Sequence, residues 1–264
     1  MITHNPVAEL SAFIPVIAMQ AYLIAMGILV IGGTLLDVLH KKSAQYFFEA
    51  GKTSKANAKR QVSGGEKISI AVQTAVVDVL ASGEFCNPRR RIAHLLTMYG
   101  FILFLIATVI LVFMYPTPDT LAPAYLPLLW HLGALMVCVG GYWFWFVIRV
   151  DVAAEGYPWY RLVRADLFIL SLLATTSFAL IWSFLQWSGS GAVATVFFVL
   201  FIVASTVLFG SVLWSKFAHM FFKPAAAFQR RVSEAEGSRD NLPPPAKAPK
   251  QFGLGINREL PRHY

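Results

Sequence analysis

Charged residues are scarce in this chain. Asp, Glu, Lys and Arg make up only 14% of its 264 residues, whereas a soluble globular domain carries about 25%. Hydrophobic residues account for 57%, and the mean hydropathy is +0.60. A surface this apolar is incompatible with water. The composition therefore excludes the soluble enzyme folds and predicts an integral membrane protein.

Cysteine is also scarce. The two cysteines, Cys86 and Cys138, lie 52 positions apart. Without a Cys-x-x-Cys pair, the chain lacks the usual spacing of an iron–sulfur or zinc site. Carboxylates are nearly absent from the apolar runs, where Asp37 stands alone. A buried acid in a membrane is costly and often functional, so two alternatives remain open: an ion pair with Lys41, or a proton or quinone role.

Long uncharged runs predict five membrane-spanning helices, because a span needs about 20 mostly apolar residues. Pro116 and Pro118 close the second, and Ser188–Gly191 separates the last two. We therefore expect an all-α, integral membrane bundle of five transmembrane helices. The spans are expected at residues 15–39, 94–115, 128–149, 166–187 and 192–222.

The basic residues predict the orientation of the bundle. All 22 Lys and Arg fall in the loop between spans one and two, the loop between spans three and four, or the end of span five and the tail. Such residues mark the cytoplasmic side, which places the N-terminus outside and the C-terminus in the cytoplasm. The net charge of +8 therefore indicates a membrane surface, and nucleic acid is not expected as a partner.

The parts outside the bilayer are small. Residues 1–224 are expected to form the membrane domain, and residues 225–264 an extended, Pro-rich cytoplasmic tail. The loop 41–93 contains an apolar helical stripe that predicts a helix lying in the membrane interface. Its residues are Ile68, Val72, Ala75, Val76, Val79 and Leu80. Catalysis on a soluble substrate would therefore require another polypeptide.

Four histidines lie at helix ends or inside helices. A b-type haem needs two imidazoles from helices at matching depth, and His94 and His219 meet this requirement at the cytoplasmic level. His40 and His131 are the alternative ligands. Gly100 and Thr97 on the helix of His94 fit either of two explanations: close approach of a flat macrocycle, or a helix–helix contact. An ordinary interfacial histidine is the competing interpretation of the pair.

Charged residues near the predicted loops suggest two further features. The triple Arg89, Arg90 and Arg91 fixes topology and offers a docking surface for an acidic partner. Asp166, beside the second cytoplasmic loop, is expected at the surface.

Four stretches carry a family resemblance. They run from Val79 to Asn87, from Arg90 to Phe101, from Trp130 to Arg149 and from Phe217 to Pro224. The last three resemble helices two, three and five of a group of respiratory membrane b-cytochromes. That group includes the gamma subunit of nitrate reductase and the membrane subunits of heterodisulfide-reductase-like complexes. The first stretch looks like the sulfur-metabolism branch, where the lack of an added Cys-rich domain favours the membrane anchor subunit of adenylylsulfate (APS) reductase.

The resemblance implies a function in electron transport. It implies a multi-pass subunit of a bacterial or archaeal cytoplasmic (inner) membrane, exchanging electrons between the quinone pool and a cytoplasmic iron–sulfur flavoenzyme, adenylylsulfate reductase. In this group, histidines at the positions of His94 and His219 ligate one haem b. Phe104 and Phe201 stand where a second haem would need ligands. The alternative is a cofactor-free anchor that only recruits the reductase, and a small transporter is a third class.

Overall fold

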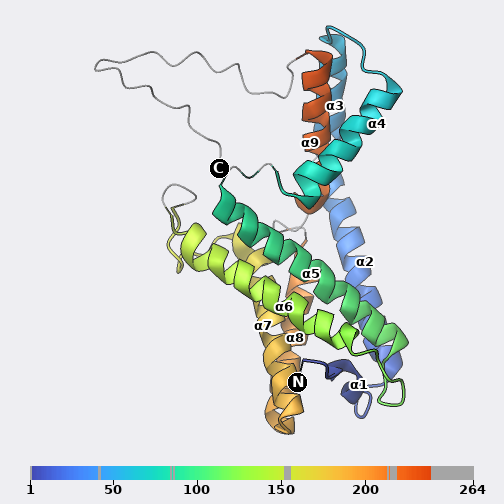
Figure 1. Cartoon of the computed structure of the whole chain (residues 1–264), viewed down its shortest axis with the longest axis vertical. Helices are drawn as coiled ribbons and strands as arrows, with labels where there is room; N and C mark the ends of the chain where they lie inside the picture. Colours follow the sequence, from blue (N-terminus) through green and yellow to red (C-terminus); the bar gives the residue numbers. More distant parts are fainter. Residues whose placement is uncertain are drawn as a thin grey trace, which may run out of the picture. The chain divides into compact units, whose positions relative to one another are not determined.

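The computed structural model in Figure 1 describes residues 2–40, 43–83, 85, 87–151, 156–212, 214 and 219–238. Every regular element in these ranges is helical. The chain divides into two compact units, which are described separately. Unit 1 comprises Met1–His40 and Ile92–Ala218, and unit 2 comprises Lys41–Arg91 and His219–Tyr264.

Five of the described helices are long and apolar enough to cross a membrane. They alternate in direction along the chain, and α5 and α6 run side by side in Figure 1. The expected all-helical bundle of five membrane-spanning helices is confirmed. The spans are α2 (Val16–His40), α5 (Pro88–Met114), α6 (Tyr125–Trp143) with its π-helical continuation η2 (Phe144–Ile148), α7 (Leu167–Trp187) with the short 3₁₀ turn η3 (Arg164–Asp166) before it, and α8 (Gly191–Gly210).

The fifth span and the tail differ from the prediction. The helix expected over residues 192–222 ends at Gly210, and a separate helix, α9 (His219–Glu236), begins after it. Twenty residues of helix already cover about 30 Å, the thickness of the hydrocarbon core, and Gly and Ser are poor helix formers. The segment 225–236, expected to be extended, is helical up to Gly237, whose φ of +72° ends the helix. The remainder of the predicted tail, 239–264, lies outside the described residues.

Glycines bring α5 and α6 into close backbone contact within unit 1. A Cβ on Gly133 would lie 2.6 Å from the backbone nitrogen of Phe104, and one on Gly140 would lie 2.6 Å from the carbonyl oxygen of Ala93. Neither position has room for a side chain. Small residues of this kind let membrane helices approach closely and gain packing contacts.

Large aromatic side chains fill the space beside this contact. Trp130 is 1% exposed and Trp182 is 2% exposed. The Trp130 ring centroid lies 5.0 Å from that of Phe104 and 6.1 Å from that of Trp182. The indole N–H of Trp130 donates to Oγ1 of Thr108 at 3.0 Å, so its polar group is satisfied inside the apolar core.

The first residues of the chain also belong to the core of unit 1. Asn5 caps α1 (Pro6–Leu10) by accepting from the backbone N–H groups of Val7 and Ala8. Its side-chain amide donates to the carbonyl oxygen of Tyr115 at 3.0 Å. Val7 and Leu10 are each 4% exposed, within the same core cluster as Trp130 and Trp182.

Unit 2 is built from the loop after the first span together with α9. Its elements are α3 (Ser43–Ala56), α4 (Gly64–Gln73), the π-helical η1 (Thr74–Leu80) and α9. Its helices are joined by polar contacts: Ser54 and Ser233 share a buried hydrogen bond of 2.7 Å, and Arg231 donates to both carboxylate oxygens of the half-buried Asp78 at 2.7 and 2.9 Å.

Candidate functional site

The two predicted haem ligands fall in different units. His94 is half-buried in the second turn of α5, within unit 1, and His219 is the first residue of α9, within unit 2. The side chain of His219 is outside the described part of the chain. The His94–His219 pair therefore remains a prediction.

The small-residue face of α5 is filled by protein. A Cβ on Gly100 would lie 2.7 Å from the carbonyl oxygen of Gly133, and Oγ1 of Thr97 lies 2.8 Å from the Cβ that Gly140 would carry. Of the two explanations for Gly100 and Thr97, the structure shows the helix–helix contact. A haem on His94 would have to use another face of α5.

His131, an alternative ligand, has both ring nitrogens engaged. Nδ1 lies 2.7 Å from the carbonyl oxygen of Pro127, and because a carbonyl only accepts, Nδ1 carries the proton. In the neutral ring, Nε2 then accepts the hydroxyl of Ser183 at 2.7 Å. Iron could bind Nε2 only by displacing Ser183. The side chain therefore serves to link α6 to α7 inside the membrane.

The other predicted polar residues of α2 lie near one end of the span. Asp37 is 3% exposed and lies three positions before His40, the exposed last residue of the helix. The alternative partner of Asp37, Lys41, lies outside the described residues. Burial near a membrane boundary is consistent with both roles considered for this carboxylate.

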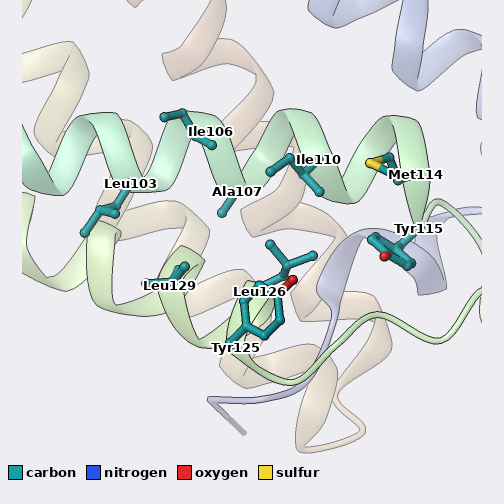
Figure 2. Close-up of a pocket in the computed structure, with 9 residues that line it drawn as sticks. All are labelled: Leu103, Ile106, Ala107, Ile110, Met114, Tyr115, Tyr125, Leu126 and Leu129. Atoms are coloured by element: carbon teal, nitrogen blue, oxygen red, sulfur yellow. The ribbon is translucent and has the colours of Figure 1, made fainter.

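A cavity of about 340 Å³ opens along α5 and α6 (Figure 2). Its volume is at the lower end of the range for small-molecule sites, about 300–1,000 Å³. Two tyrosines, Tyr115 and Tyr125, line the cavity together with aliphatic side chains and one methionine. Leu103, the lining residue nearest to His94 in sequence, lies nine positions away, about 13 Å along the helix axis. The cavity therefore does not adjoin the predicted haem ligand.

The arginine triple occupies the first turn of α5, in unit 2. Asn87 caps this turn by accepting from the backbone N–H of Arg89 at 2.9 Å. Arg91 donates from Nε to the carbonyl oxygen of Ala81 at 2.7 Å, and the Arg90 guanidinium lies 5.8 Å from the centre of the Phe85 ring. These contacts hold the turn before α5. The side chain of Arg89 is exposed, so it is the member of the triple best placed to meet a partner.

A buried ion pair that the sequence analysis missed closes the end of α6. Arg149 is 0% exposed, and its Nη2 donates to Oδ2 of Asp166 at 2.6 Å and to the carbonyl oxygen of Arg161 at 2.6 Å. Its Nη1 donates to the carbonyl oxygen of Pro158 at 3.0 Å, and the guanidinium lies 4.2 Å from the centre of the Trp145 ring.

The surface position expected for Asp166 is therefore wrong. This carboxylate is 7% exposed because it neutralises a fully buried guanidinium. The signal available in the sequence was the pair of opposite charges on either side of one short loop between two spans. The pair is structural, since it fastens the loop between α6 and α7 to the bundle.

Charge divides unevenly between the two units. The ranges of unit 2 contain 18 basic and 8 acidic residues, a balance of +10, and those of unit 1 contain 4 basic and 6 acidic residues, a balance of −2. Among the described residues, no group of three or more His, Cys, Asp and Glu side chains could hold a metal ion. No family model, curated protein or solved structure matches the chain. The charge of unit 2 is thus the chemical feature on which a functional proposal depends.

Proposed function

We propose that this chain is the membrane subunit of a sulfur-metabolism respiratory complex. It exchanges electrons between the quinone pool and a cytoplasmic iron–sulfur flavoenzyme of the adenylylsulfate reductase type, in a bacterial or archaeal cytoplasmic membrane. The observation that carries the proposal is the charge balance of +10 over the ranges of unit 2, which is joined to a bundle of five apolar helices. A chain of this kind has a membrane part and a docking part, and its soluble partner supplies the catalysis.

The docking step follows from electrostatics. A basic surface attracts an acidic partner, increases the rate of encounter and disfavours basic competitors. Arg89 is exposed at the start of a membrane span, where a docked partner would be close to quinone in the bilayer. Arg90 and Arg91 contact Phe85 and Ala81 in the turn before that span.

A haem on His94 and His219 remains part of the proposal. When bound, it would relay single electrons between the quinone and the iron–sulfur partner. The imidazoles of His94 and His219 would ligate its iron, and Asp37 would supply a buried carboxylate for the protons of quinone chemistry.

A cofactor-free anchor is the second candidate. It is favoured by one specific observation, which is that α6 occupies the small-residue face of α5 at Gly100. Such an anchor would keep the reductase at the membrane by surface contact alone, and electrons would reach quinone through the partner.

Co-purification combined with spectroscopy tests both candidates. The chain is expressed in a haem-sufficient host that contains the reductase and is isolated in mild detergent. We expect an iron–sulfur flavoprotein to accompany it, and a reduced-minus-oxidised spectrum to show b-type Soret and α bands. The bands should disappear in His94→Ala and in His219→Ala, and they should persist in the control His4→Ala.

The outcomes are distinguishable. A co-purified flavoprotein without haem bands identifies the anchor. Haem that survives both substitutions shows that His40 or His131 is a ligand. If no iron–sulfur flavoprotein accompanies the chain, and Arg89→Glu changes nothing in what co-purifies, the proposed function is refuted.

A further inference from the structure

The helix formed by α4 and η1 leaves an apolar face uncovered within unit 2. Ile68 is 68% exposed, Val72 58%, Val76 51% and Leu80 49%. These four residues, spaced four apart, define what we call the α4–η1 apolar face. Four large aliphatic side chains on one stripe are costly in water, since each buried methylene contributes about 0.8 kcal/mol.

The opposite side of the same helix is folded against the rest of unit 2. Ile70 and Thr74 are 9% and 3% exposed, and Asp78 is held by Arg231 of α9. The outward direction of the α4–η1 apolar face is therefore fixed by contacts on its reverse side. Rotating the helix to hide Val72 would break the ion pair and expose Ile70.

Short connections join the helices of unit 2 to three membrane spans. Two residues separate the end of α2 from α3, seven separate η1 from α5, and eight separate α8 from α9. A fully extended chain spans at most about 3.6 Å per residue. The two-residue connection holds the start of α3 within about 11 Å of the end of a membrane span, and the other two connections reach at most about 25–29 Å.

The charge of unit 2 favours a lipid surface over water. Its balance of +10 attracts anionic headgroups, and juxtamembrane basic residues near such a surface add to binding. An apolar stripe on a helix within a basic unit is the pattern of helices that lie in the interface plane.

We propose that the α4–η1 apolar face is a lipid-binding surface that inserts into the headgroup–acyl boundary of the bilayer, with Ile68, Val72, Val76 and Leu80 as the immersed side chains. Ser69 and Gln73, which are exposed beside the stripe, lie at the polar edge. This inference does not depend on the identity of the soluble partner or on the presence of haem.

Site-directed spin labelling of the full chain tests the proposal. Single cysteines are introduced by Val72→Cys, Val76→Cys and Gln73→Cys in a background where Cys86 and Cys138 are replaced by Ala, and the purified chain is reconstituted in vesicles of three parts POPC to one part POPG. Collision of each label with oxygen, which concentrates in lipid, is compared with collision with a water-soluble nickel chelate.

We expect the oxygen-to-nickel ratio to be severalfold higher for labels at Val72 and Val76 than for the adjacent label at Gln73. All three positions are exposed in the folded unit, so exposure alone predicts equal ratios. Ile31→Cys, an exposed position within α2, supplies the lipid reference, and Thr53→Cys on α3 supplies the water reference.

Equal ratios at Val72 and Gln73 in these vesicles, both matching the water reference, would overturn the proposal. Labels that become protected only in native membranes would also overturn it, because a protein partner would then cover the face. Hydrogen exchange of α9 in each labelled variant verifies that unit 2 is folded, so a water-like ratio in a folded variant counts against lipid insertion.

Discussion

We expect the Asp78–Arg231 ion pair to contribute a large part of the stability of unit 2. Replacing Arg231 with Ala leaves the Asp78 side chain, which is only 6% exposed, without its two charge-assisted bonds of 2.7 and 2.9 Å. Loss of one partner of a buried pair costs about 3–5 kcal/mol. Because the Arg231 side chain is 22% exposed, and water screens the pair on that side, we expect a smaller cost of about 2–3 kcal/mol.

Hydrogen exchange of the full chain in detergent measures this cost. A loss of about 2–3 kcal/mol corresponds to exchange about 30- to 150-fold faster in peptides that cover η1 and α9, since each 1.4 kcal/mol is tenfold. Peptides from α6 and α7 should exchange at the same rates in Arg231→Ala as in wild type. Arg230→Ala is the matched control, because the neighbouring arginine is exposed and its loss should change the rates by less than about threefold.

The pH dependence gives the same prediction a second test. The hydrogen bonds and positive charge of Arg231 hold the pKa of Asp78 below its ordinary value. The stabilisation from this ion pair is therefore fully present above a pH of about 4, the ordinary carboxyl pKa. It is lost as the pH falls through the lower pKa that Asp78 has in the folded state. Wild type and Arg231→Ala should differ fully at pH 7 and converge in acid. A variant that exchanges as slowly as Arg230→Ala at pH 7 would refute the reasoning.

Three further predictions concern unit 1, with thermal unfolding in detergent as the measurement. Gly133→Val should lower the melting temperature by many degrees because its side chain would meet backbone at 2.6 Å, whereas Gly27→Val, with nothing within 4 Å, should not. Arg149→Met should cost about 3–5 kcal/mol, and adding Asp166→Asn should recover part of this loss. Additive losses would show that the pair is not coupled. His131→Phe should cost only about 0.6 kcal/mol, the average for a hydrogen bond between membrane helices, and a loss of all folded protein would contradict that estimate.

The five spans were predictable because their signal is local. An uncharged run of 20 residues has few alternatives in a membrane, and Pro116 and the Ser188–Gly191 turn mark the breaks between runs. The end of the fifth span was misplaced because hydropathy continues past Gly210, and only the geometry of the chain shows that the helix stops there. Helix α9 was missed because its stability comes from contacts with η1 and α3, which lie more than 130 residues away in sequence.

The site residues show the same limit. Arg91 was expected in the loop before the second span, whereas it lies in the first turn of α5. Its bond to the Ala81 carbonyl depends on a turn that composition does not specify. Gly100 fitted both a macrocycle contact and a helix–helix contact, because a small residue indicates a close approach without identifying the group that approaches. Its neighbour, Gly133, is supplied by another helix. Asp166 was misjudged because burial of a charge depends on its partner, and Arg149 lies 17 positions away.

The contact between Asn5 and Tyr115 has a consequence for biogenesis. The amide of Asn5 leaves the ribosome early, but the carbonyl it binds is made 110 residues later, and the core that holds Val7 and Leu10 includes residues of α6, α7 and α8. Chains are synthesised from the N-terminus at about 5–20 residues per second. The first ten residues must therefore wait for several seconds of translation, and their docking can be completed only after the last span has joined the bundle.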